Sequence, residues 1–308
     1  MKDRNMETIN IEGLEEIGHG ATSRVYLLDT EKVIKAYYPW MKLEEVERER
    51  TASRASFRRG VPTANAYELV RAGDGYGVIY DRIQAVTLAE VIQDNPRTLK
   101  QYAEESAGFL RRLHQIHFSK EELPDTRQNW WQLCSMGLVR CLTLEQKERL
   151  HSFLMSLPGN DTFVHGDYHA RNIMLRDGQL ILIDVGDASC GMSVMDLSAM
   201  YMACIILPKQ STAKHIKNIQ MNPEQGSEFW NTFFRAYLGE KYEEIHADAE
   251  EIVKMFALFR QCMTYSLLPS KSEDEKSAFL APRLEQLFAA MEGDGPLSSG
   301  RVYPEALL

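Results

Sequence analysis

The first part of the chain alternates apolar and polar residues in short runs, with the two-residue period that is typical of β-strands. A charged stretch from Leu43 to Arg59 interrupts these runs and predicts a helix. Gly60 and Pro62 end that helix, because glycine adopts the conformation that terminates helices and proline cannot continue one. The pattern therefore predicts a small sheet with one helix packed on it. The predicted strands are 14–17, 24–28, 32–36, 66–71 and 77–83.

The larger remainder of the chain follows a different period. Its apolar residues recur at spacings of three and four, as in helices with one buried face. This pattern predicts helices near 99–117 and 150–157, and again from 192 to about 291. We therefore expect an α+β fold with two lobes: a small antiparallel sheet lobe with one helix over 1–83, and a larger, mainly helical lobe over 84–308.

The helical pattern is broken in the middle of the second lobe. Three short apolar runs there, at 162–164, 173–175 and 180–183, are typical of strands. Asp177 and Gly178 separate the last two runs, and an Asp-Gly pair between apolar runs predicts a hairpin turn. A small strand-and-turn insert is therefore expected among the helices.

The composition narrows the classes of function. The 308 residues carry a formal net charge of −9, whereas proteins that bind nucleic acid over a broad surface are normally basic. No apolar run approaches the ~18 residues that a membrane span needs, and the polar start lacks the apolar segment of a signal peptide. The five cysteines form no CxxC pair, so neither a zinc site nor a disulfide framework is indicated. We therefore expect a cytoplasmic protein without nucleic acid or membrane partners.

The residues with the clearest chemistry lie between the short predicted strands, in the stretch from Val164 to Asn172. Asp167 follows His165 by two positions and precedes Asn172 by five, and Asp184 ends the next apolar run. An aspartate in such a loop can accept or orient a hydroxyl proton. The asparagine oxygen, and a carboxylate at the end of a buried strand, can bind a hard cation such as Mg²⁺. An isolated turn of this kind would only satisfy backbone groups, but the full spacing favours a catalytic site.

The sequence of this stretch, His-Gly-Asp-Tyr-His-Ala-Arg-Asn, resembles that of the aminoglycoside phosphotransferase and choline kinase-like family, in which His-Gly-Asp-x-His is usual. The resemblance covers roughly residues 11–200 and implies a two-lobed, protein kinase-like fold. It implies ATP-dependent transfer of a phosphoryl group, with ATP and Mg²⁺ as cofactors. Asp167 would then be the catalytic residue, and Asn172 and Asp184 the metal ligands. The chain departs from the family at Val185, where an aromatic residue often follows the metal-binding aspartate.

The resemblance also implies a nucleotide-binding set upstream. Lys35 lies on a predicted strand, where its ammonium would reach the α- and β-phosphates. A carboxylate from the next helix must hold that lysine; Glu49 is the first choice and Glu47 is the alternative. Backbone N–H groups of a glycine-containing turn would cover the phosphates, although its last member is a serine where protein kinases place a third glycine. The residues of that turn are Gly18, Gly20 and Ser23.

Further positions follow from the same resemblance. The main chain near Asp81 and Ile83 should meet adenine, so the identity of these side chains carries little information. Asp196 would support the catalytic loop, or would be a carboxylate that the helix dipole favours at a helix start. His165 is expected to be a buried hydrogen-bonding strut rather than a proton shuttle.

The sequence does not identify the molecule that accepts the phosphoryl group. A small-molecule kinase acting on an amino sugar, amino alcohol, sugar or homoserine hydroxyl is favoured over a protein kinase. The catalytic loop has His169 where protein kinases tend to carry lysine, and no Ala-Pro-Glu segment follows Asp184. A catalytically silent nucleotide-binding scaffold is a third alternative, against which the complete set of site residues argues. An acidic chain would suit a cationic acceptor, while ATP-against-GTP preference and oligomeric state stay open.

Three features of the second lobe bear on the acceptor. The acidic run at 240–251 could attract an amine, but such runs are more often a solvated helix face. The stretch from Gly293 predicts an irregular tail without a carboxylate cluster, which favours a metabolic role over antibiotic resistance. Several aromatic residues either wall a pocket or, as is more common, form core. These aromatic residues are Trp130, Trp131, Trp230, Phe233 and Phe234.

Overall fold

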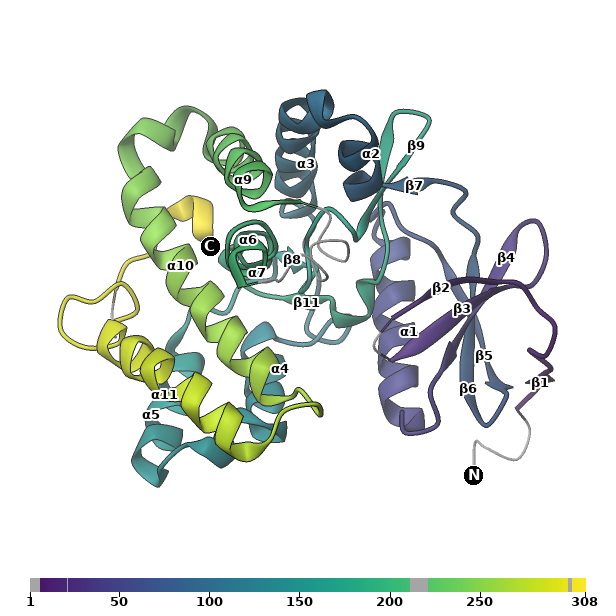
Figure 1. Ribbon diagram of the computed structural model, residues 1–308, viewed down its shortest axis with the longest axis horizontal. Coiled ribbons are helices and arrows are strands. Elements are labelled where there is room, and N and C mark those ends of the chain that lie inside the picture. The colour runs from purple at the N-terminus through teal and green to yellow at the C-terminus, as the bar shows by residue number, and fades with distance from the viewer. Residues whose placement is uncertain (1–5, 21, 211–220, 299–300) are drawn as a thin grey trace. The chain divides into compact units, whose positions relative to one another are not determined.

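The chain falls into two compact units in the computed structural model (Figure 1). The first unit contains the chain up to Val86 together with Asn172–Ala188, and the second contains Thr87–Arg171 and the chain from Ser189 onward. The lobe boundary near Ile83 stays a prediction of the sequence. The structure describes residues 6–20, 22–210, 221–298 and 301–308.

Parts of three sequence predictions lie outside the described residues. They are Ala21 of the predicted phosphate-covering turn, residues 211–220 of the predicted helical stretch, and residues 299–300 of the predicted tail.

A six-stranded sheet forms the first unit, in the order β1-β5-β6-β4-β3-β2. The neighbouring strands from β5 to β2 pair antiparallel, as the alternating pattern predicted. The edge strand β1 pairs parallel with β5, so the sheet is mixed. Two residues are too few to show a period, which is why the sequence did not reveal β1. The strands are β1 (Thr8–Ile9), β2 (Glu16–His19), β3 (Ser23–Leu27), β4 (Lys32–Tyr37), β5 (Ala66–Ala72) and β6 (Gly75–Asp81).

Helix α1 (Leu43–Arg58) packs on one face of this sheet (Figure 1). Gly60 follows the helix at a φ of 86°, a left-handed conformation that glycine adopts without strain, as the sequence predicted. Val46 of the helix is fully buried. It lies in one apolar cluster with Tyr37, Ala66 and Val78 of the sheet.

The predicted hairpin is present in the first unit, between β9 (Ile173–Arg176) and β10 (Gln179–Leu182). Asp177 and Gly178 both have positive φ, 51° and 77°, as a tight two-residue turn requires. The N–H of Leu182 donates to the carbonyl of Pro62 over 2.8 Å, which attaches the hairpin to the segment that follows α1.

The second unit is mainly helical, as the spacing of its apolar residues predicted. Helix α3 packs on α9, and the long helix α10 packs on α6 and α11 (Figure 1). The described helices are α2 (Leu88–Asp94), α3 (Leu99–Leu113), α4 (Thr126–Met136), α5 (Leu144–Ser156), α6 (Val194–Tyr201), α7 (Leu207–Gln210), α9 (Pro223–Leu238), α10 (Tyr242–Ser266) and α11 (Glu273–Ala290). None of the described helices has both the length and the apolar character to cross a membrane.

Two short strands and a π-turn complete the second unit. Strand β8 (Phe163–Val164) pairs antiparallel with β11 (Ser189–Cys190), and the π-turn spans Met202–Ile206 between α6 and α7. Strand β7 (Val86–Thr87) contains the last residue of the first stretch of the first unit and the first residue of the second unit. The aromatic residues that the sequence assigned either to a pocket wall or to the core are buried, except for Trp131. Trp131 is half-buried and packs against His151. The buried ones are Trp130, Trp230, Phe233 and Phe234.

Candidate active site

Lys35, Glu49 and Asp184 form a charged group in the first unit, here called the Lys35 cluster. The Nζ atom of Lys35, in β4, lies 2.5 Å from Oε1 of Glu49 in α1 and 2.7 Å from Oδ1 of Asp184 after β10. The side chains of Lys35 and Glu49 are 15% and 16% exposed, whereas that of Asp184 is 54% exposed. Three residues far apart in sequence thus meet, and the carboxylate that holds Lys35 is Glu49, not the alternative Glu47.

The charge of Lys35 is fixed by its two partners. Burial lowers the pKa of its ammonium, but the carboxylates of Glu49 and Asp184 raise it by more, so the pKa lies well above its ordinary value. Lys35 therefore carries a full positive charge at any physiological pH. Such a cation, on a rigid central strand, can bind an anionic group such as a phosphate.

Two backbone features bring the segment after β10 close to α1. Asp184 adopts a left-handed conformation with a φ of 60°, which aspartate tolerates better than most residues. A Cβ atom on Gly186 would lie 2.0 Å from Cγ of Glu49, so only glycine fits at this position. Gly186 therefore lets Glu49 reach Lys35 while the same segment presents Asp184. Val185, where the family often has an aromatic residue, is buried.

Asn172 and Asp184 flank the β9–β10 hairpin. The N–H of Ile183 donates to the carbonyl of Asn172 over 3.0 Å, which extends the ladder and places the two predicted metal ligands on neighbouring strand ends. No group of three or more histidine, cysteine or acidic side chains that could hold a metal occurs among the described residues. Mg²⁺ commonly takes only one or two protein carboxylates and completes its shell with phosphate and water, so this oxygen donor pair fits it.

The glycine-containing turn has part of its backbone already engaged. The N–H of Gly20 donates to the carbonyl of Ser23 over 2.9 Å, and the N–H of Tyr38 donates to that of Thr22. Gly18 lies in β2, and the side chain of Ser23 is buried at the start of β3. Contact between this turn and phosphate stays a prediction.

The predicted adenine-binding segment ends strand β6. The carboxylate of Asp81 accepts from Lys32 Nζ at 2.7 Å and from the hydroxyl of Tyr67 at 3.0 Å. The N–H of Asp81 donates to the carbonyl of Asn65. The Asp81 N–H is therefore engaged within the first unit, and contact between the main chain near Asp81 and Ile83 and a nucleotide base stays a prediction.

The predicted catalytic aspartate lies in the second unit, in residues 165–169 after β8, here called the Asp167 loop. The loop turns at Gly166, whose φ is 89°. The N–H groups of His165 and Gly166 donate to the two carboxylate oxygens of Asp196 over 2.9 and 2.8 Å. Asp196 is fully buried, so it supports the loop from below, as one of the two sequence alternatives held.

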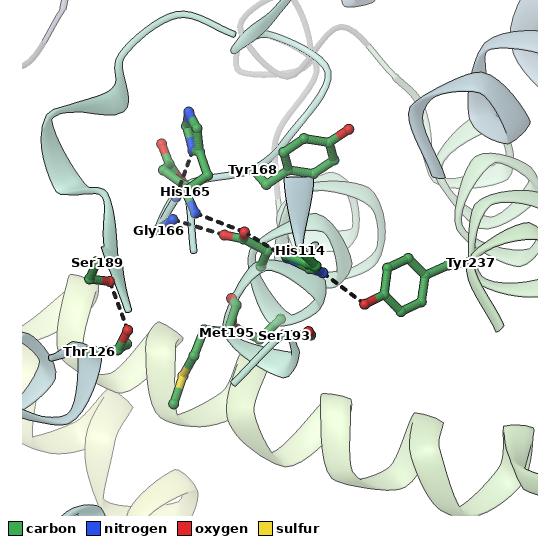
Figure 2. A network of polar contacts seen from close by, with 12 residues as sticks. His114, Thr126, His165, Gly166, Tyr168, Ser189, Ser193, Met195 and Tyr237 are labelled. Atoms are coloured by element: carbon green, nitrogen blue, oxygen red, sulfur yellow. Dashed lines mark hydrogen bonds and ion pairs between the residues drawn. The ribbon is translucent and has the colours of Figure 1, made fainter. Parts of the chain in front are cut away.

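Asp196 is itself held by a chain of side chains. Figure 2 shows His114 between Tyr237 and the loop: its Nε2 lies 3.2 Å from Oδ2 of Asp196 and its Nδ1 lies 2.8 Å from the Tyr237 hydroxyl. The Tyr237 hydroxyl also donates to the carbonyl of Ala306. The N–H of Ser193, at the start of α6, donates to the carbonyl of Leu308 over 2.7 Å. Residues near position 308 therefore take part in supporting the loop.

The Asp167 carboxylate has its own partners. His169 Nε2 lies 3.2 Å from Oδ2 of Asp167, and the N–H of Asp167 donates to Nδ1 of His165. Burial raises the pKa of Asp167, but the nearby His169, Arg260 and His165 lower it by more, so the pKa lies well below its ordinary value. Asp167 is therefore ionised at neutral pH. His165 is fully buried and accepts from the loop, which is the strut role expected for it.

Sequence reasoning missed three residues that contact this loop or its support. They are His114, Tyr237 and Arg260, and each lies far along the chain from Asp167. Arg260 had a detectable signal, since it is a charged residue inside the apolar run Met255–Met263 of a long helix. The other two have no such signal.

Comparison with known protein families identifies the family of the chain. Residues 13–247 match the phosphotransferase enzyme family, APH. The chain belongs to this family of phosphotransferase enzymes, as the resemblance implied. No curated protein sequence matches the chain.

Solved structures agree with the fold. The streptomycin–ATP–APH(2")-IIa ternary complex is 17% identical over 93% of this chain and 95% of that chain, with a TM-score of 0.57. ADP-bound aminoglycoside phosphotransferase APH(2'')-Ib is 17% identical over 93% of each chain, with a TM-score of 0.53. A choline/ethanolamine kinase family protein from Mesorhizobium loti is 15% identical over 91% of this chain and 88% of that chain, with a TM-score of 0.50. These likenesses confirm the predicted protein kinase-like fold.

Proposed function

We propose that the protein transfers the γ-phosphoryl group of ATP to a hydroxyl of a small molecule. The observation that carries this proposal is the Lys35 cluster, in which one lysine is paired with both Glu49 and Asp184. A structural ion pair needs one carboxylate. The second one, more than half exposed at the end of the hairpin, is accounted for if this group binds a metal-bound polyphosphate.

In the first unit, Lys35 neutralises charge on the α- and β-phosphates, and Glu49 fixes the direction of the lysine side chain. Asn172 and Asp184 would hold Mg²⁺, which supplies charge neutralisation at the phosphate oxygens when bound. Gly18, Gly20 and Ser23 would cover the phosphates, and the main chain at Asp81 and Ile83 would meet the base.

In the second unit, Asp167 orients the acceptor hydroxyl and takes its proton. Because its pKa lies below the ordinary range, Asp167 is a weak base. It therefore receives the proton late, after the acceptor oxygen has begun to bond to phosphorus. Orientation and electrostatics then supply most of the rate enhancement.

The acceptor is proposed to be an amino sugar, amino alcohol, sugar or homoserine-type alcohol. Similar folds occur in proteins named as aminoglycoside, amicoumacin and choline/ethanolamine kinases. The net charge of −9 supports a cationic member of this group. The exposed acidic residues on the first turns of α10 contribute to that charge; they are Glu243, Glu244, Asp248 and Glu251.

The test is ADP release from Mg·ATP across a panel of amino sugars, choline-like alcohols, sugars, homoserine and one generic protein, with Asp167→Asn alongside. We expect turnover with one small acceptor and a loss of about 10²–10⁴-fold in kcat for the variant, with ATP binding retained. Asp161→Asn is the matched control, because Asp161 is an aspartate of the same unit whose carboxylate is 68% exposed and pairs with His117. Full activity of Asp167→Asn, or no binding of Mg·ATP to the wild type, would contradict the proposal.

A further inference from the structure

We propose that Arg260 is a positioning residue of the phosphoryl-transfer site, which fixes the peptide bond between Gly166 and Asp167 so that the Asp167 carboxylate has one orientation. This inference rests on the proposed role of Asp167. Arg260 lies on α10, beyond the residues 13–247 that match the family.

The guanidinium of Arg260 bonds three different acceptors. Its Nη1 donates to the carbonyl of Gly166 over 2.7 Å, and its Nη2 donates to the carbonyl of Met195 over 3.0 Å. Its Nε donates to the hydroxyl of Ser198 over 3.3 Å. One planar group thus joins the Asp167 loop to two positions of α6. Figure 2 shows two of the joined residues, Gly166 of the loop and Met195 of α6.

The loop is therefore held at several main-chain groups next to Asp167. The N–H of Gly166 donates to Asp196, and the carbonyl of Gly166 accepts from Arg260. The next N–H, that of Asp167, donates to His165 Nδ1 over 3.2 Å. The peptide unit between 166 and 167 is thus fixed at both its oxygen and its nitrogen, which sets the direction in which the Asp167 side chain leaves the backbone.

Burying an arginine at position 260 costs free energy unless its guanidinium makes specific contacts. Arg260 is only 7% exposed, and its guanidinium lies 5.3 Å from the centre of the Trp130 ring. Burying a cation costs more than burying an apolar residue of the same size, so packing alone would favour an apolar side chain. The planar guanidinium of arginine donates from three separate nitrogens in a fixed plane, whereas the three donors of lysine all leave from one nitrogen. The same charge helps to keep the pKa of Asp167 low.

The experiment compares Arg260→Met and Arg260→Lys with the control Arg149→Met. Arg149 also donates from one helix to a main-chain carbonyl, that of Phe288, and lies 5.2 Å from an aromatic ring centre, but it has no contact with the Asp167 loop in the part of the chain described. We expect Arg260→Met to lower kcat about 10–100-fold with little change in the KM for ATP. Arg260→Lys should recover part of that loss, and Arg149→Met should keep the wild-type kcat.

Amide hydrogen exchange gives a readout that does not depend on activity. Arg260→Met should speed exchange at the amides of 165–167, while the amides of α5 and α11 stay unchanged. Arg149→Met should show the opposite pattern. If Arg260→Met does not fold, Arg260→Lys carries the same comparison.

The double variant with Asp167→Asn separates the two proposals. If Arg260 acts through Asp167, Arg260→Met has no further effect on kcat once Asp167 is replaced. The positioning role would be overturned if the losses of kcat in Arg260→Met and Asp167→Asn multiplied in the double variant. An unchanged kcat in Arg260→Met, or unchanged amide exchange at 165–167, would also overturn it. Full activity of Asp167→Asn alone would instead overturn the proposed function, and the exchange data would still show whether Arg260 holds the loop.

Discussion

The Lys35 cluster and the Asp167 loop hold their functional groups by different means. In the Lys35 cluster, one lysine side chain contacts two carboxylates directly, and the contacts depend on the long, flexible side chains of Lys35 and Glu49. In the Asp167 loop, buried side chains bond the main chain, through the N–H groups of His165 and Gly166 and the carbonyl of Gly166. The first arrangement can change its contacts when phosphate and metal arrive, whereas the second is already complete.

This difference matches the chemistry proposed for the Lys35 cluster and for the Asp167 loop. A group that binds a polyphosphate has to exchange one set of charge contacts for another, since Asp184 is paired with Lys35 in the structure and would bind metal in the complex. A group that orients one hydroxyl gains most from being fixed beforehand. The following predictions test whether the loop is the rigid part and the cluster the adaptable part.

The largest effect should come from Asp196→Asn. Asp196 is fully buried and accepts from two loop amides, and an asparagine cannot accept from both and also receive the His114 contact. We expect a loss of about 3–5 kcal/mol in the free energy of unfolding at pH 7, measured by urea denaturation. Asp161→Asn, at an exposed position, should change this free energy little.

The pH dependence of the same variant follows from the Asp196 pKa. Burial raises it, but His114, His165 and the loop amides lower it by more, so the folded-state pKa lies below the ordinary value. The stabilisation is therefore complete above about pH 4, the pKa in the unfolded chain, and is lost as the pH falls through the folded-state value. The gap between wild type and variant should narrow in acid; a constant gap would show that the charge of Asp196 does not matter.

The next largest effect is expected from Lys35→Met, and it should be seen in the rate of phosphoryl transfer. Loss of one preorganised cation should reduce kcat about 10²–10³-fold and raise the KM for ATP. The matched control is Lys32→Met, on the same strand, because Lys32 pairs with Asp81 at a site that is about one-third exposed. That ion pair should contribute about 0–1 kcal/mol. Equal losses of activity in the two variants would show that strand β4, and not the cluster, is what matters.

The smallest predicted effect concerns Gly186. A methyl group there would press on Glu49, so Gly186→Ala should destabilise the protein by about 1–3 kcal/mol and weaken the Lys35–Glu49 contact. Gly20→Ala is the control for stability, because among the described residues, its chain neighbours aside, no atom lies within 4 Å of a Cβ at that position. Thermal unfolding of both variants checks the prediction, and a Tm of Gly186→Ala equal to that of the wild type would contradict the close approach.

The sequence predicted most of the first unit and the local part of the site. The Gly60 helix end, the Asp177–Gly178 turn and the spacing from His165 to Asp184 are all local signals that depend on short stretches of chain. The support of the loop could not be predicted in the same way. His114, Tyr237 and Arg260 reach it from three different helices, and no period or spacing relates them to Asp167. Strand β1 was missed for a related reason, since only pairing with β5 defines it.

The tip of the β9–β10 hairpin offers a place for a spectroscopic reporter. Residues 176–179 are exposed, and the chain runs directly from them through two short strands to Asn172 and Asp184. Exposed loop tips tolerate chemical change because they carry little packing. A fluorophore attached at Arg176 would leave the turn-forming pair intact, and its emission would follow metal and nucleotide arrival in real time, without a coupled assay and before any acceptor is known.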